Sequence, residues 1–319
     1  MSTEIVRTLA GHRFVTDGGL ETDVIFHHGV DLPEFASFPL LDDAAGRRLL
    51  VDYYAGYADV AAAAGVGMLL EAPTWRASHD WGARLGYDDA ALHRVNCAAI
   101  AFLAERRSVA LATHGDRLGP VLTCGVVGPR GDGYQAASEV DADAAQAYHA
   151  PQLEAFAEAG ADLATAYTMT TTEEAIGIVC AAHAVDLPVL LSFTVETDGR
   201  LPDRTLLADA IVAVDAAAPP EGFGVNCAHP RHILAGLDPS IPGWAERIVS
   251  TRVNASVLSH AELDEAAELH DGDPAELAID QSILMGRLPS LSIVGGCCGT
   301  DVRHVAAMWD GSHLAGQVH

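Results

Sequence analysis

Short apolar runs alternate with longer helix-like segments eight times along this chain of 319 residues. The runs predicted as strands cover residues 14–17, 66–70, 121–127, 161–167, 189–195, 224–227, 247–254 and 291–295. Apolar spacing and capping residues predict helices over 44–64, 88–107, 141–158, 204–217, 274–285 and 301–308, and another that begins at Thr172. Eight β/α units in about 300 residues favour a closed α/β barrel, the (β/α)8 TIM barrel, over an open doubly wound sheet. No long linker divides the chain, so we predict a single domain over residues 1–319.

Charge and lysine content exclude several classes of function. The formal net charge of −26 argues against binding to nucleic acid or to anionic membrane surfaces, which require basic patches. The sequence contains no lysine, so arginine supplies all of its permanently basic side chains. Without a lysine amine the chain cannot use Schiff-base aldolase chemistry, attach pyridoxal phosphate or form a P-loop.

The six cysteines bear on compartment and chemistry. Residues 1–19 lack the apolar run of a secretory signal, and no stretch of about 20 apolar residues could span a bilayer. Cysteines in a long chain without such a signal favour a reducing compartment and a use in metal binding or catalysis. We therefore predict a cytoplasmic enzyme. Cys97, Cys124 and Cys180 fall inside predicted helices or strands and are interpreted as core thiols.

In barrels of this kind the reactive groups lie at the carboxyl ends of the strands. Here this rule selects Asp17, Glu71, Tyr167, Cys227, Asn254, Cys297 and Cys298. The long connection over residues 26–41 contains Pro33 and Pro39 and is predicted to cross the mouth of the barrel. We therefore expect the functional site at this end of the barrel.

Three of these residues are thiols that could hold a metal ion. Cys297 and Cys298 lie between glycines directly after the last predicted strand, and Cys227 ends the sixth. These strands are near neighbours around the ring, so the three thiols can face one another. Three protein ligands with an open fourth position are typical of a catalytic zinc site. Buried thiols in a tight turn are the alternative interpretation, and His229 and His232 are further candidate ligands.

The open fourth position indicates the kind of substrate. Three thiolates outweigh the charge of a zinc ion, so such a site polarises water weakly and suits a further thiol. Zinc deprotonates a thiol ligand near neutral pH, whereas a free thiol has a pKa of about 8.5. A zinc hydrolase would generally carry a His-x-His pair at the end of the first strand, where this chain has Asp17-Gly18-Gly19. The pattern therefore favours alkylation of a thiol substrate.

Segments along nearly the whole chain resemble the zinc-dependent homocysteine S-methyltransferase family. They are Asp17-Gly18-Gly19 with Glu21-Thr22, Thr74-Trp75-Arg76-Ala77-Ser78, Gly125-Val126-Val127-Gly128-Pro129, Ser192-Phe193, Gly224-Val225-Asn226-Cys227 and Gly295-Gly296-Cys297-Cys298-Gly299-Thr300. The resemblance implies a (β/α)8 barrel in which Cys227, Cys297 and Cys298 bind zinc. It also implies that the sulfur of homocysteine completes the ligand set and takes a methyl group from a charged donor, giving methionine.

The resemblance also implies a substrate pocket. By position, Asp17 and Gly18 look like part of the pocket for the amino and carboxyl groups of homocysteine, and Asn226 is expected to orient the zinc ligands. Glu71 and Tyr167 complete the predicted substrate-binding residues. Asp17 could instead be a turn-forming carboxylate before two glycines.

Two departures from the family pattern bear on specificity. Family members usually have a glutamate at the end of the fourth strand, which binds the substrate's amino group, whereas this chain has Tyr167. After the second strand, the usual Glu-Thr-Asn-Thr is replaced by Glu71-Ala72-Pro73-Thr74. Betaine-using members have a tyrosine where this chain has Arg76, and a cation there would repel a quaternary ammonium group. S-methylmethionine or S-adenosylmethionine is therefore favoured as the donor.

Two alternatives to homocysteine methylation stay open. One is the same zinc-thiolate chemistry on a different thiol, and the other is a barrel that binds zinc or a small thiol without turnover. The expected partners are a small-molecule thiol and a methyl donor, with neither nucleic acid nor membrane, and a homo-oligomer is compatible with the sequence.

Overall fold

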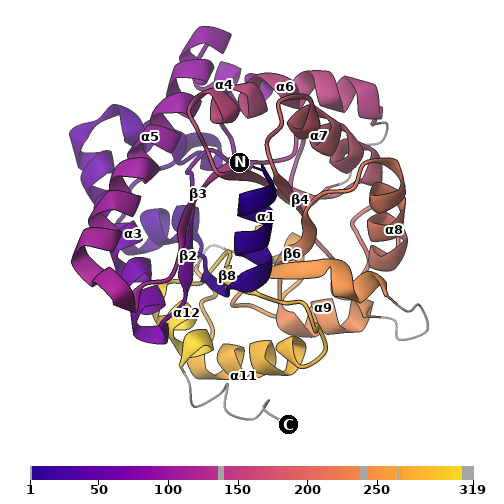
Figure 1. The fold of residues 1–319 in the computed structure, drawn as a ribbon. Coiled ribbons are helices and arrows are strands. Elements are labelled where there is room, and N and C mark those ends of the chain that lie inside the picture. Colours follow the sequence, from indigo (N-terminus) through magenta and orange to yellow (C-terminus); the bar gives the residue numbers. More distant parts are fainter. Residues whose placement is uncertain (1, 136–139, 238–242, 265, 267, 311–319) are drawn as a thin grey trace.

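The chain forms a closed barrel of eight strands surrounded by helices (Figure 1). This computed structural model describes residues 2–135, 140–237, 243–264, 266 and 268–310. The strands follow one another around the ring in chain order, and the last pairs with the first, with Phe14 opposite Ile293. Every neighbouring pair is parallel, so all eight carboxyl ends meet at one end of the barrel. The predicted TIM barrel is confirmed.

Each run predicted as a strand contains one. The strands are β1 (Phe14–Val15), β2 (Gly67–Glu71), β3 (Val121–Val127), β4 (Leu163–Met169), β5 (Val189–Phe193), β6 (Gly222–Ala228), β7 (Ile248–Val253) and β8 (Ile293–Gly296). The predicted end of the first strand at Asp17 is wrong, because β1 ends at Val15. A backbone hydrogen bond of 2.8 Å from Gly296 N to Asp17 O nevertheless holds Asp17 beside β8. β4 continues past Tyr167 to Met169.

The predicted helices are present, and several end at other residues than expected. The α-helices are α1 (Ser2–Gly11), α2 (Leu20–Thr22), α3 (Ala44–Ala64), α4 (His79–Arg84), α5 (Asp89–His114), α6 (Ala142–Glu158), α7 (Thr172–Ala184), α8 (Leu207–Ala217), α9 (Pro230–Gly236), α10 (His260–Asp264), α11 (Pro274–Met285) and α12 (Val302–Trp309). α8 begins after the predicted Arg204, whose φ of 76° is incompatible with a right-handed helix. α1, α2, α4, α9 and α10 are absent from the predicted set. No described helix is long and apolar enough to cross a membrane.

Helix α1 lies across the centre of the ring in Figure 1. Leu9 belongs to a buried apolar cluster, and Ile5 packs against it. The other members come mainly from the first residues of the strands and are Phe14, Leu69, Leu122, Cys124, Leu163, Leu190 and Ile293. α1 therefore covers the end of the barrel opposite the carboxyl ends of the strands.

Helix α3 connects the packing of the barrel to the site. Its tyrosines Tyr53, Tyr54 and Tyr57 are all buried. The Tyr53 hydroxyl donates to the carbonyl of Gly18 at 3.1 Å, and the Tyr54 hydroxyl donates to the carbonyl of Glu71 at 2.5 Å. α3 therefore fixes the backbone beyond the ends of β1 and β2.

The connection over residues 26–41 contributes to the mouth of the barrel, as predicted. It includes the end of the π-helical turn η1 (Asp23–His27), the 3-10 turn η2 (Pro33–Phe35) and most of η3 (Phe38–Asp42). Phe26 and Phe35 line the cavity that lies at the carboxyl ends of the strands. This segment therefore supplies apolar surface to the site.

Candidate functional site

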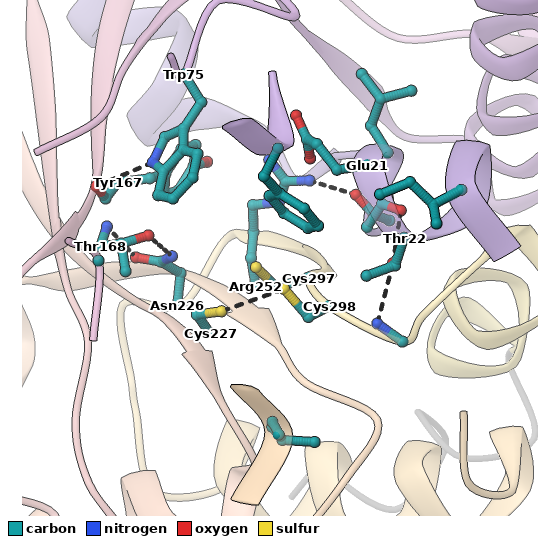
Figure 2. Close-up of a pocket in the computed structure, with 18 of the residues that line it drawn as sticks. Glu21, Thr22, Trp75, Tyr167, Thr168, Asn226, Cys227, Arg252, Cys297 and Cys298 are labelled. Atoms are coloured by element: carbon teal, nitrogen blue, oxygen red, sulfur yellow. Dashed lines mark hydrogen bonds between the residues drawn. The ribbon is translucent and has the colours of Figure 1, made fainter. Parts of the chain in front are cut away.

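A cavity of about 470 Å³ lies at the carboxyl ends of the strands (Figure 2). Every residue predicted to bind substrate or metal contributes to its wall, namely Asp17, Gly18, Glu71, Tyr167, Asn226, Cys227, Cys297 and Cys298. The wall also contains Glu21, Tyr134 and Arg252, to which the sequence gives no role in the site. The barrel therefore gathers the predicted residues, and it adds charged and aromatic neighbours that change their chemistry.

The three predicted thiols converge in this wall. Cys227 lies near the end of β6, and Cys297 and Cys298 directly follow β8. Their sulfur atoms lie within 4.8 Å of one another, and Cys227 Sγ is 3.5 Å from Cys298 Sγ. Figure 2 shows the three side chains pointing toward one another. No other group of three or more such metal-ligating side chains occurs in the part of the chain that the structure describes.

The two histidines that follow Cys227 do not join this group. His229 is the N-cap of α9, where its Nδ1 accepts a hydrogen bond of 3.3 Å from the backbone N–H of Arg231. The His229 and His232 rings lie 5.9 Å apart. The structure therefore gives His229 a capping role, and the thiols stand as a set of three.

The three thiols form a donor set that could hold a metal ion. Three thiolates are a ligand set that zinc accepts, and a catalytic zinc site keeps its fourth position open. The backbone around Cys227 is held firmly, since its carbonyl accepts hydrogen bonds from Asn254 Nδ2 at 3.0 Å and from His260 Nε2 at 2.8 Å. These contacts fix the direction of the Cys227 side chain, as the surroundings of metal ligands commonly do.

A tyrosine without a predicted role covers the thiols. The Tyr134 hydroxyl lies 3.2 Å from Cys227 Sγ and 3.5 Å from Cys298 Sγ. Its ring stacks on His260 with centroids 4.4 Å apart. Tyr134 follows a glycine-rich turn after β3, and nothing in that local pattern indicates a partner on β6 or β8. Only the closed ring of strands brings them together.

Mutual hydrogen bonds give the thiols unequal acidity. Bonds donated by Cys227 and Cys298 hold the pKa of Cys297 well below its usual value, and the charge of Arg252 acts in the same direction. The pKa values of Cys227 and Cys298 are raised, because each donates a hydrogen bond to a neighbouring sulfur.

The most important residue that the sequence does not predict is Arg252 on β7. Its guanidinium donates hydrogen bonds to carboxylate oxygens of both Asp17 and Glu71, the latter at 2.5 Å. It also donates to the carbonyls of Gly18 at 2.6 Å and Gly296 at 2.8 Å. One guanidinium therefore joins the ends of β1 and β2 to β8.

This arrangement revises the predicted substrate pocket. Asp17 and Glu71 lie in the cavity wall as expected, but each carboxylate is already paired with Arg252. The Tyr167 hydroxyl donates to Glu71, and the Arg252 guanidinium lies 5.0 Å from the centre of the Tyr167 ring. The Tyr167 ring therefore makes a cation–π contact with the protein's own Arg252, and its hydroxyl is paired with Glu71.

Burial of Asp17 makes the stability of the fold depend on pH. Burial raises the pKa of Asp17 to about 8, although the charge of Arg252 lowers it. An unfolded aspartate has a pKa of about 3.9. Because the folded state binds this proton more tightly, the stability that it contributes is complete below about pH 4 and is lost as the pH rises toward 8.

Replacing Asp17 with asparagine should remove this dependence. We expect the free energy of unfolding of the wild type to fall relative to that of Asp17→Asn as the pH rises from 5 to 8, measured by urea denaturation. Asp52→Asn, which changes an exposed carboxylate on α3, should leave the wild-type profile unchanged. Parallel profiles for the wild type and Asp17→Asn would contradict the assignment.

Asn226 holds three strands together beside the thiols. Its Oδ1 accepts hydrogen bonds from Ser192 Oγ at 2.7 Å and from the Thr168 N–H at 2.9 Å. Its Nδ2 donates to Thr168 Oγ1 at 2.9 Å. Through these bonds Asn226 links β4, β5 and β6 and fixes the residue before Cys227. These contacts are compatible with the predicted orienting role.

The remaining cysteines lie away from the three thiols. Cys124 is buried on β3, where its sulfur lies 3.1 Å from Thr165 Oγ1. Cys97 and Cys180 are half-buried on α5 and α7. The interpretation as core thiols therefore holds fully for Cys124, whereas Cys97 and Cys180 lie at the edge of the core. All six cysteines are free thiols.

Comparison with known proteins identifies relatives of this chain. The family model described as "Homocysteine S-methyltransferase" matches residues 14–310. A homocysteine S-methyltransferase of Escherichia coli (strain K12) is 25% identical over 270 residues, which is 82% of each chain. Homocysteine S-methyltransferase 4 of Zea mays is 27% identical over 323 residues, covering 94% of this chain and 89% of the maize protein.

Solved structures agree on the fold. The oxidized form of the homocysteine methyltransferase MmuM from Escherichia coli aligns with a TM-score of 0.76 and 22% identity, covering 95% of this chain and 98% of MmuM. Its metallated form aligns with a TM-score of 0.74 and 21% identity over 96% of this chain and 99% of MmuM. The barrel described above is therefore the fold of that enzyme.

Proposed function

Because the chain belongs to the homocysteine S-methyltransferase family, we propose that it moves a methyl group from a charged donor to the thiol of homocysteine, giving methionine. The observation that carries this proposal is the convergence of three sulfur atoms within 4.8 Å in the wall of a cavity. Three thiols with space in front of them suit a substrate whose reacting atom is a fourth sulfur.

Cys227, Cys297 and Cys298 would hold the zinc ion. When bound, zinc would lower the pKa of the substrate thiol and so provide a nucleophile at neutral pH. The carbonyl contacts of Asn254 and His260 would keep Cys227 in place while substrates exchange. Because a bound zinc ion would supply this acidification, no protein group would be needed as a general base.

The chain's own contribution to the reaction is orientation. The methyl group must lie in line between the donor's leaving atom and the attacking sulfur, and holding two reactants in such a geometry accelerates a reaction strongly. Phe26 and Phe35 give the cavity an apolar surface, and Arg252 anchors the polar side through Asp17 and Glu71. The cavity wall would therefore exclude water from the transfer.

The surroundings of Arg76 argue against betaine as the donor. Its guanidinium carbon lies 4.0 Å from the Trp75 ring centre and 3.6 Å from that of Trp81. Aromatic faces are the surfaces that bind quaternary ammonium groups, and here an arginine occupies them. S-methylmethionine or S-adenosylmethionine is the proposed donor.

The proposal is tested by offering zinc-loaded protein L-homocysteine with each donor and measuring methionine by mass spectrometry. We expect methionine from a sulfonium donor, much less from betaine, and none from protein treated with a chelator. Zinc-loaded protein that forms no methionine with any donor would rule the proposal out. A methylated product from another thiol offered in parallel would identify the same chemistry on a different acceptor.

The expectations about location and partners belong to this proposal. We propose a cytoplasmic enzyme whose partners are a small-molecule thiol and a methyl donor. The net charge of −26 supports partners other than nucleic acid and anionic membrane surfaces.

A further inference from the structure

Arg76 is a buried cation without an anionic partner. Its side chain follows β2 and lines the cavity, and the residue is only 7% exposed. Its Nη1 donates to the carbonyl of Gly131 at 3.1 Å, but its buried Nε has no hydrogen-bond partner among the described residues. No carboxylate in the described part of the chain lies within 4.0 Å of its guanidinium. Burial of a charge in this state costs free energy, so buried charges are normally paired.

The contrast with Arg252 shows how unusual this is. Arg252 makes two carboxylate and two carbonyl hydrogen bonds in the same cavity wall. Arg76 has instead two indole faces, which fix the plane of its guanidinium without neutralising it. Burial lowers the pKa of Arg76 to about 10, so the group is still charged at neutral pH. An anionic group on a ligand would complete its contacts.

Glu21 lines the same cavity and is a carboxylate without a cationic partner. The hydrogen bonds to Glu21 come from uncharged groups, namely the Ser37 hydroxyl at 2.7 Å and its own backbone N–H, and burial raises the pKa of Glu21. No arginine or histidine lies within 4.0 Å of its carboxylate among the described residues. Figure 2 shows Glu21 in the cavity wall with Arg252, whose ion pairs go to Asp17 and Glu71.

Glu21 and Arg76 line the same cavity but do not form an ion pair with each other. The charge of Glu21 raises the pKa of Arg76, although burial lowers that pKa more strongly. Asp132, whose charge also raises it, is exposed and makes no ion pair with Arg76 either. A cation and an anion that line one cavity without touching leave room between them for a ligand that carries both charges.

We propose that Glu21 and Arg76 form a binding site for an α-amino-acid zwitterion, in which Glu21 accepts hydrogen bonds from the ammonium group and Arg76 donates to the carboxylate. This inference rests on the proposed function, because homocysteine and the sulfonium donors all carry this zwitterion. Charge-assisted hydrogen bonds to a planar guanidinium are among the stronger polar contacts in proteins. The site takes over the ammonium recognition for which Asp17 and Glu71 are no longer free.

The test compares ligands that lack one charge at a time. Binding of L-homocysteine and of S-methyl-L-methionine to the zinc-loaded full chain is measured by calorimetry, beside their analogues without the amino group and without the carboxyl group. Glu21→Gln should weaken the binding of amine-bearing ligands about 10- to 100-fold and leave the affinity for the des-amino analogues unchanged. Arg76→Met should weaken carboxylate-bearing ligands by a similar factor and leave the des-carboxy analogues unchanged.

A matched pair of control residues, Arg84 and Glu34, lies beside Trp81 and does not line the cavity. Arg84 stacks on the same Trp81 ring at 4.5 Å and pairs with Glu34 at 3.1 Å. Glu34→Gln and Arg84→Met should leave all of these affinities at the wild-type level. Ligand-free Arg76→Met should melt at or above the wild-type temperature, because the substitution removes a buried charge without a partner.

The ligand that responds identifies the source of the zwitterion. Loss of homocysteine affinity assigns the site to the acceptor, and loss of S-methylmethionine affinity assigns it to the donor. The proposal would be overturned if Glu21→Gln lost as much affinity for the des-amino analogues as for the amino acids. It would also be overturned if both variants bound both amino acids with wild-type affinity. Glu21-dependent binding without any methyl transfer would reject the proposed function and leave the zwitterion site standing.

Discussion

Replacing Cys227 with serine should release the metal and abolish methyl transfer. A serine hydroxyl stays protonated at neutral pH, so the substitution removes one of three anionic ligands from a site that has no other sulfur or nitrogen donor among the described residues. Loss of a residue that only supports a ligand costs about 10- to 100-fold in affinity, so loss of a ligand should reduce methionine formation by at least about 10³-fold. Metal content of the purified protein is measured by mass spectrometry beside the activity.

A cysteine outside the site provides the control for this result. Cys180→Ser, on the half-buried face of α7, should retain the metal content and the activity of the wild type. The double variant Cys297→Ser/Cys298→Ser should behave like Cys227→Ser. If the double variant kept a full equivalent of metal, the three thiols would not be the metal site, and the proposed mechanism would fail with it.

The barrel and the thiols could be predicted because both depend on patterns that repeat locally. Eight apolar runs separated by helical segments leave few alternatives to a closed parallel ring. Once the ring is assumed, the carboxyl ends of β6 and β8 must lie near one another, whatever the details of packing. Cys227, Cys297 and Cys298 are therefore brought together by topology alone.

The surroundings of the thiols could not be predicted in the same way. Arg252 lies within β7, where its local pattern is that of a polar residue in a half-buried strand. Its partners Asp17 and Glu71 are 235 and 181 residues away in the chain, and no spacing rule connects them. The same holds for Tyr134, which contacts Cys227 on β6 and Cys298 directly after β8.

The predicted role of Asp17 in substrate binding shows how a correctly placed residue can still be assigned the wrong partner. A carboxylate at the end of β1 has the right place in the sequence to bind an ammonium group, and the structure does put it in the cavity wall. Asp17 could bind a substrate ammonium group only if no cation of the protein were already paired with it. Arg252 is paired with Asp17. The proposed site for the ammonium group is therefore Glu21, the carboxylate that Arg252 leaves unpaired.

Replacing Arg252 with methionine should destabilise the fold more than any change at the surface. The side chains of Asp17 and Glu71 are only 5% and 2% exposed, so without the guanidinium two carboxylates would remain buried side by side. Breaking a buried ion pair by removing one partner costs about 3–5 kcal/mol of unfolding free energy. The loss, measured by urea denaturation, should be larger at pH 8 than at pH 5, because protonation relieves the repulsion at low pH.

Removing the stranded carboxylates as well should restore the fold. Arg252→Met/Asp17→Asn/Glu71→Gln should recover most of the stability lost in Arg252→Met, because neutral amides in place of the carboxylates remove the uncompensated charges. Arg84→Met, which breaks an exposed pair of 3.1 Å with Glu34, should change stability by less than about 1 kcal/mol. The opposite outcome is a triple variant that stays as unstable as Arg252→Met. In that case the guanidinium would stabilise the fold through its hydrogen bonds to the Gly18 and Gly296 carbonyls, and not by neutralising Asp17 and Glu71. Recovery of stability without recovery of substrate affinity would show that Arg252 also positions the cavity wall for the reaction.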